Sequence, residues 1–207
     1  MGLNVAAFAY ELSLGPGLEG FIVARAVVPA RLAGEWQAGG AALADAGRSI
    51  LTAMFLHGGW LHLIFNLWFL WIFGDNVEDR LGRARYLFLY LVAGAAATVA
   101  HVVADPSSTI PTVGASGAIA GVLGAYFVTY PRARVTTVIP FFVFIRVAVL
   151  PAWVVLGMWF LLQFLSGALA LASTQASLGG VAWWAHIGGF ATGAILMPLL
   201  SIGRRPR

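Results

Sequence analysis

Residues 147–203 read VAVLPAWVVLGMWFLLQFLSGALALASTQASLGGVAWWAHIGGFATGAILMPLLSIG and contain no Asp, Glu, Lys or Arg. A transmembrane helix needs roughly 20 apolar residues. This run of 57 residues is therefore too long for one crossing and long enough for two. The polar, small-residue patch at 173–180 predicts a turn between two helices, near 150–172 and 182–202.

Three shorter uncharged runs precede this stretch, at residues 49–74, 86–104 and 106–131. Together the runs predict five full spans within residues 51–202. Residues 1–13 are interpreted as the C-terminal part of a first helix, because about ten helical residues cover only about 15 Å. We therefore expect an all-α fold: a polytopic membrane helical bundle of six transmembrane helices, the first truncated at its N-terminus.

The amino-acid composition also indicates a membrane protein. The chain has 207 residues, of which 60% are hydrophobic and 10% charged, whereas soluble domains average about 25% charged residues. This excludes a soluble enzyme, a disordered tail and a nucleic-acid-binding domain. The chain contains no cysteine, which also excludes disulfides, thiolate catalysis and Cys-based metal sites.

Arginine placement predicts the orientation, because positive charge concentrates on the cytoplasmic side. Nine of the twelve arginines fall at three places that alternate correctly with the spans: Arg80, Arg83 and Arg85; Arg132, Arg134 and Arg146; Arg204, Arg205 and Arg207. We expect a single domain over 1–207 in the cell (inner) membrane, with a basic cytoplasmic tail at 203–207. The loop at 14–50 is expected outside, in the membrane interface, because its apolar residues favour that position.

Strongly polar groups at membrane depth are costly, so each is a candidate for function. The candidates are His57, His62, Asn66, His101, Ser116 and His186.

Ser116 lies in the sequence Gly-Ala-Ser-Gly at 114–117, after a stretch with two prolines. A helix from Ser116 to Tyr130 covers about 22 Å, which is too short to span the membrane. Ser116 is therefore expected at a helix N-terminus below the outer surface, in a cavity that water can reach. The alternative is that Gly117 and its neighbours only pack helices together.

His186 lies near the outer end of the last span, at a depth comparable to that of Ser116. Gly189 and Gly193 form a small-residue face that can pack against the one beginning at Gly117. A serine beside a histidine is a nucleophile with its general base. No carboxylate is expected at this depth unless Asp105 folds in, so the sequence predicts a dyad rather than a three-member triad. The alternative is a lone, hydrogen-bonded core histidine.

His62 and Asn66 are four residues apart and share one helix face. Their side chains, with the Ser116 backbone N–H, are suitable donors to a developing oxyanion. The alternative is that they tie two helices together. His57 is expected to be structural, His101 has the weakest case, and the histidine spacing argues against a metal site.

Four motifs occur in one order: HGGWLHLIFN at 57–66, GDNVEDRLG at 74–82, GASG at 114–117 and AHIGGFATG at 185–193. In these motifs the chain resembles the rhomboid family of intramembrane serine proteases, in its compact six-helix bacterial form. The resemblance extends from about Ser49 to Ile202.

The resemblance implies that Ser116 is the nucleophile and His186 the base, and that His62 and Asn66 complete the oxyanion hole. It implies transmembrane protein substrates within the lipid bilayer. No cofactor, metal or nucleic-acid partner is expected from the residues, and the arginine distribution places the active site toward the non-cytoplasmic side. The span near 150–172 and the loop at 173–180 would form the substrate gate. The residues expected to be structural near the site are His57, Gly114, Gly117, Gly189 and Gly193.

Some family members have a tyrosine under the histidine ring, where this chain has Ala120. Trp183 or Trp184 is expected to support the ring instead. The main alternative function is a catalytically silent rhomboid-like protein that binds membrane clients, and a transporter or channel is a third class. The sequence predicts no oligomeric state and no particular substrate.

Overall fold

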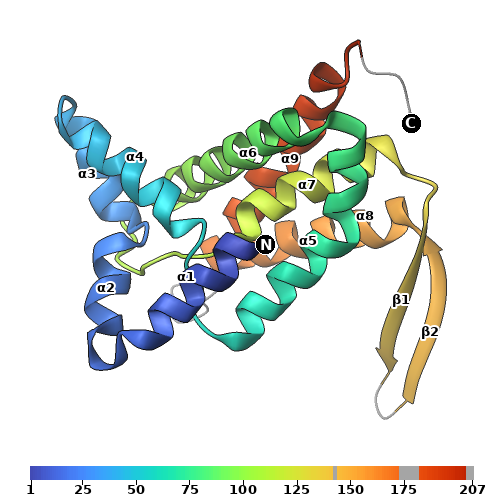
Figure 1. Ribbon diagram of the computed structural model, residues 1–207, viewed down its shortest axis with the longest axis horizontal. Helices are drawn as coiled ribbons and strands as arrows, with labels where there is room; N and C mark the ends of the chain where they lie inside the picture. Colours follow the sequence, from blue (N-terminus) through green and yellow to red (C-terminus); the bar gives the residue numbers. More distant parts are fainter. Residues whose placement is uncertain (142–143, 173–181, 204–207) are drawn as a thin grey trace.

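A computed structural model describes residues 1–141, 144–172 and 182–203 of the chain as helices and one β-hairpin (Figure 1). The elements, in order, are α1 (Gly2–Ser13), η1 (Gly15–Gly17), α2 (Leu18–Arg25), α3 (Pro29–Ala38), α4 (Ala42–Ala53), α5 (Trp60–Leu81), α6 (Arg83–Ala104), α7 (Ser116–Thr129), β1 (Arg134–Phe141), β2 (Phe144–Pro151), α8 (Ala152–Ala172) and α9 (Trp183–Leu200). The predicted turn at 173–180 and the end of the tail lie outside the described residues.

Of the described helices, three are long and apolar enough to cross a membrane: Arg83–Ala104, Ala152–Leu171 and Trp183–Leu200. Helix α7 is apolar but shorter, at 14 residues. It packs against α5, α6, α8 and α9, and every residue from Gly117 to Tyr126 is buried. A helix that is apolar on all sides belongs in the interior of a bundle, and α7 occupies that place.

Helices α7 and α9 cross with their backbones in contact. A Cβ built on Gly193 would collide with the carbonyl oxygen of Gly121, and one built on Gly189 would collide with that of Gly117. Close crossings of this kind require small residues on both helices, because a larger side chain separates the two backbones. The small-residue faces expected from the sequence therefore meet in the structure.

The expectation that residues 49–74 form one span is wrong. Helix α4 ends at Ala53, a non-helical segment follows, and α5 begins at Trp60 and continues to Leu81. The uncharged run shows which residues can lie in hydrocarbon, but it does not show where the helix begins or ends. A helix continues until the backbone leaves the helical conformation. The turn comes at Gly82, whose φ of +74° lies in the left-handed region that favours glycine.

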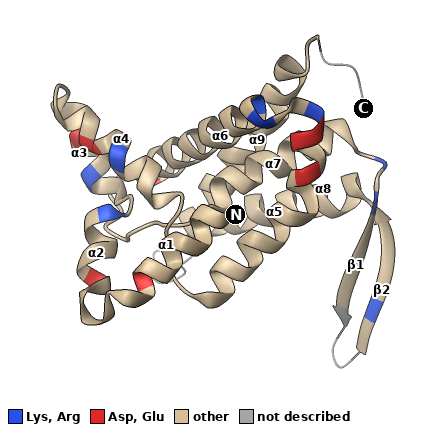
Figure 2. Cartoon of the chain, viewed as in Figure 1, with Lys and Arg blue, Asp and Glu red and all other residues tan. Residues whose placement is uncertain are grey.

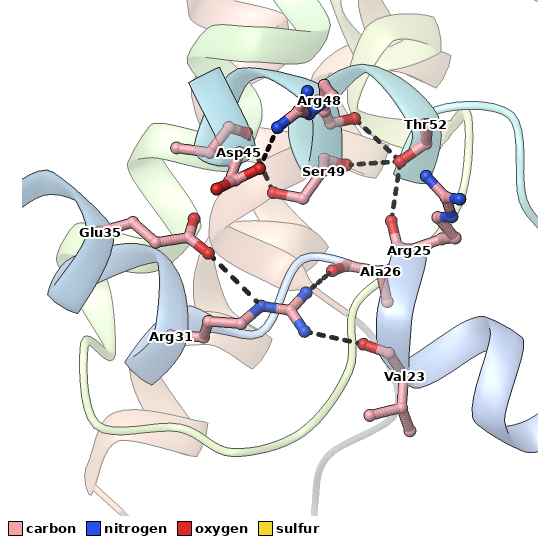
Figure 3. Close-up of polar contacts among 10 residues, drawn as sticks. Val23, Arg25, Ala26, Arg31, Glu35, Asp45, Arg48, Ser49 and Thr52 are labelled. Atoms are coloured by element: carbon pink, nitrogen blue, oxygen red, sulfur yellow. Dashed lines mark hydrogen bonds and ion pairs between the residues drawn. The ribbon is translucent and has the colours of Figure 1, made fainter. Parts of the chain in front are cut away.

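The stretch at 14–50, expected as a loop, is largely helical and forms α2, α3 and most of α4. Figure 3 shows polar contacts that connect these helices. The Arg31 guanidinium donates to the backbone carbonyls of Val23, at 2.9 Å, and of Ala26. The Thr52 hydroxyl on α4 donates to the Arg25 carbonyl at the end of α2, at 2.8 Å.

This helical unit is joined to the segment that leads into α7. Val27 and Thr112 exchange backbone hydrogen bonds of 3.1 and 2.7 Å. The Gly114 N–H also donates to the carbonyl of Ala53, at the end of α4, at 2.9 Å. The start of α7 is thereby fixed from the N-terminal part of the chain.

Charged side chains gather at two ends of the bundle, and the described parts of α7, α8 and α9 carry none (Figure 2). At one end, the Arg85 guanidinium donates to the carbonyls of Leu200, at 2.6 Å, and Ile202, at 3.1 Å. The end of α9 therefore lies beside the start of α6. The antiparallel hairpin of β1 and β2, between α7 and α8, was not predicted.

We expect Gly193→Ala to lower the midpoint of thermal unfolding in detergent by several degrees, since overpacking a tight contact costs about 1–3 kcal/mol. The matched control is Gly157→Ala on α8, where a Cβ would lie 3.8 Å from the Phe127 ring, at ordinary contact distance. The control should leave the midpoint unchanged or raise it. Equal midpoints for the two variants would contradict the described α7–α9 crossing.

Candidate active site

A cavity of about 900 Å³ is lined by α5, α6, α7, α8, the start of α9 and the segment at 105–114 that leads into α7. Polar groups that are far apart in the sequence face it from several elements. The lining residues relevant to chemistry are His62, Asn66, Gly114, Ser116, Trp159 and His186. The structure therefore brings together the four residues that the sequence analysis assigned to the dyad and the oxyanion hole.

Ser116 is the first residue of α7, and its hydroxyl lies beside the backbone of Gly114. Gly114 has a φ of +130°, and a Cβ built there would lie 2.7 Å from two atoms of the His62 ring and 3.6 Å from Ser116 Oγ. A side chain at Gly114 would therefore displace the His62 imidazole. Glycine at this position allows the serine and the imidazole to face the same space.

His186 uses both ring nitrogens. Its Nε2 lies 2.9 Å from Ser116 Oγ, and its Nδ1 lies 2.6 Å from the side-chain oxygen of Gln163 on α8. The centre of the Trp159 ring lies 5.8 Å from that of His186, with the planes tilted by 37°. Three side chains from two other helices, α7 and α8, therefore converge on this imidazole.

The aromatic neighbour of His186 differs from the prediction. The sequence predicts Trp183 or Trp184 as the support, but Trp184 faces Phe164 at a centroid distance of 6.1 Å. Trp184 precedes His186 by two residues, so it points to another side of α9. Trp159 comes from α8, which no spacing within α9 could have indicated.

Gln163 was missed by the sequence analysis. Its side chain is 8% exposed within a helix that is otherwise almost wholly apolar. A single amide in an apolar span is costly for the same reason as the histidines and Asn66, and this is the sequence signal that points to Gln163.

His62 and Asn66 face the cavity from one side of α5. Asn66 is 6% exposed, and among the described residues its Nδ2 has no hydrogen-bond partner. The Gly58 N–H donates to His62 Nδ1 at 3.4 Å. A neutral imidazole that accepts at Nδ1 carries its proton on Nε2, so His62 Nε2 and Asn66 Nδ2 are both donors.

His57 and His101 each join two parts of the structure, and His101 also lines the cavity. The backbone N–H of His57 donates to the two carboxylate oxygens of Glu11 at 3.2 and 3.3 Å, which joins α1 to the segment before α5. His101 Nε2 lies 3.2 Å from the hydroxyl of Thr112, which joins α6 to the segment before α7. Within residues 1–141, 144–172 and 182–203, no three His, Asp or Glu side chains gather as metal ligands would.

Comparison with known proteins identifies the family. A model of the Rhomboid domain matches residues 45–202, well over half of the chain. The chain belongs to the rhomboid family. With its apolar helices, this membership confirms the prediction of a helical membrane bundle and makes the chain a multi-pass membrane protein.

Several curated proteins are similar in sequence. The chain is 46% identical over 76 residues to "Rhomboid protease GluP" of Bacillus subtilis, covering 37% of this chain and 14% of that protein. It is 38% identical over 77 residues to "Putative rhomboid protease YdcA" of the same organism, covering 37% and 38%. It is 32% identical over 158 residues to "RHOMBOID-like protein 4" of Arabidopsis thaliana, covering 73% and 34%. The chain therefore aligns with less than half the length of each of these relatives.

We expect Glu11→Ala to lower the midpoint of thermal unfolding. Glu11 is 1% exposed. Its loss leaves the buried backbone N–H of His57 without an acceptor, which lowers the free energy of unfolding by about 1–3 kcal/mol. Glu11→Gln keeps one acceptor oxygen and should lose less. Glu19→Ala, at an exposed position on α2, is the control; an equal loss in both alanine variants would contradict the anchoring role of Glu11.

Proposed function

We propose that this chain is an intramembrane serine endopeptidase that cleaves transmembrane segments of other membrane proteins. The observation that carries the proposal is the 2.9 Å contact between His186 Nε2 and Ser116 Oγ at the cavity. It is supported by membership of a family in which two of the similar proteins are named as proteases. The serine acts as nucleophile and the histidine as general base.

The chemistry follows from these roles. His186 Nε2 takes the hydroxyl proton as Ser116 Oγ attacks the carbonyl carbon of the scissile peptide bond. The tetrahedral intermediate then collapses, the C–N bond breaks, and His186 returns the proton to the leaving amine. In the second half-reaction a water molecule loses a proton to His186 and attacks the acyl carbon, which releases the carboxylate product and restores the Ser116 hydroxyl.

The intermediate carries an oxyanion that needs hydrogen-bond donors. Asn66 Nδ2 is supported as one donor because it is buried and has no partner among the described residues. The His62 Nε2–H is supported as a second by the tautomer that the Gly58 N–H selects. The backbone N–H of Ser116 is the third, since the first N–H groups of a helix have no partner within the helix.

The substrate enters from the bilayer in this proposal. We place the active site toward the non-cytoplasmic face and the C-terminus in the cytoplasm, on the arginine distribution and the positive-inside rule. Helix α8 and the loop at 173–180 would form the gate. The loop itself is outside the described residues.

We expect Ser116→Ala and His186→Ala each to abolish labelling of the purified protein by a fluorophosphonate, and to abolish cleavage of a transmembrane substrate in proteoliposomes. Both variants should still fold, because neither removes a charge from the interior. Ser49→Ala, which alters a serine on α4 that donates to the Ala46 carbonyl at 2.9 Å, is the control and should label normally. Wild-type protein that is folded but unlabelled would favour the alternative of a silent client-binding protein.

We expect Asn66→Ala to reduce the cleavage rate constant about 10²–10³-fold with little change in KM, as for loss of one oxyanion donor. The matched control is Asn76→Ala on the same helix, where the amide is exposed and donates to the Ile72 carbonyl at 3.4 Å. Rate constants would be measured on reconstituted protein with one fluorogenic transmembrane substrate. An Asn66→Ala rate equal to that of the control would remove Asn66 from the mechanism.

A further inference from the structure

We propose that Gln163 is a positioning residue that holds His186 in the tautomer able to accept the proton of Ser116. The inference rests on the proposed function and adds a member to its machinery. Gln163 acts through the histidine and makes no contact with the reacting atoms, so the proposal concerns the orientation and proton state of one ring.

The hydrogen bonds determine where the imidazole proton lies. An amide oxygen can only accept, so the 2.6 Å contact between Gln163 Oε1 and His186 Nδ1 requires a proton on Nδ1. In a neutral ring Nε2 is then unprotonated and accepts from the Ser116 hydroxyl, 2.9 Å away. The opposite tautomer would place a proton on Nε2 and prevent it from acting as base.

Helix α8 supports the ring in two ways. Trp159 and Gln163 are four residues apart and share one face of α8. Trp159 contacts the imidazole through its ring, while Gln163 bonds one nitrogen. The hydrogen bond to Gln163 fixes the rotation of the imidazole, and the ring of Trp159 fixes its tilt.

Burial of Gln163 favours its hydrogen bond to His186 over hydrogen bonds to water. Gln163 is 8% exposed, so water competes poorly for its oxygen, and leaving a buried amide unpaired is costly. The titratable groups that act on His186 from other elements are His62 on α5 and His101 on α6. Ser116, Trp159 and Gln163 are neutral, so the amide orients the ring without the charge that a carboxylate would add.

The test compares Gln163→Leu and Gln163→Glu with wild type as full-length protein in proteoliposomes. The rate constant for fluorophosphonate labelling of Ser116 is measured between about pH 5 and 9, and thermal unfolding reports folding. We expect Gln163→Leu to label about 10²-fold more slowly, which is the scale of a mispositioned general base. We expect Gln163→Glu to keep fast labelling and to move the acid limb about one pH unit upward, because a nearby carboxylate favours the imidazolium.

Gln37→Leu is the matched control, since it makes the same replacement at an exposed position on α3, away from the cavity and from α8. It should label at the wild-type rate with the wild-type pH dependence. If Gln163→Leu lowers only the unfolding midpoint, and Gln163→Glu leaves the acid limb in place, then Gln163 has only a packing role and the proposal is overturned.

A second measurement does not depend on activity. Nitrogen-15 spectra of histidine-labelled protein, with the His186 signals assigned by their absence in His186→Ala, report which ring nitrogen carries the proton. We expect protonated Nδ1 in wild type and a mixture of tautomers in Gln163→Leu. A proton on Nε2 in wild type would overturn the positioning role, whereas protonated Nδ1 in a protein that fails to label would overturn only the proposed activity.

Discussion

The backbone contact between α7 and α9 is the constraint on which the rest of the structure depends. Gly193 lies against the Gly121 carbonyl with no room for a Cβ, and Gly189 lies in the same way against the Gly117 carbonyl one turn along. The helix interface thus brings the first residue of α7 and the first turn of α9 to the same place. Ser116 and His186 therefore meet as a consequence of how two helices cross, and the cavity forms around them.

The other elements complete what this crossing begins. Helix α5 places His62 and Asn66, the proposed oxyanion donors, on one side of the cavity, and Gly114 leaves the space that the His62 ring occupies. Helix α8 supplies Trp159 and Gln163 on the other side. The proposed dyad needs its histidine held in one tautomer, and in our proposal the Gln163 amide does this without a buried charge, which would be costly at membrane depth.

Much of the fold class and of the candidate site could be predicted from the sequence, for physical reasons. Charge is excluded from hydrocarbon, so uncharged runs mark the spans, and polar groups such as Ser116 and His186 stand out within them. Helix ends were harder to predict, because α5 continues past the uncharged run to Leu81. The hairpin was missed because its residues are as apolar as the ends of the neighbouring spans. The contacts of Gln163 and Trp159 with His186 join two helices and depend on their relative rotation, which no local spacing determines.

The most direct test of the account is an experimental structure of the protein after reaction with a small fluorophosphonate. The account predicts phosphorus bonded to Ser116 Oγ, with the phosphonyl oxygen facing Asn66 Nδ2 and His62 Nε2, and His186 beside the adduct. Phosphorus on another side chain, or a phosphonyl oxygen directed away from α5, would contradict the proposed arrangement of nucleophile and oxyanion donors.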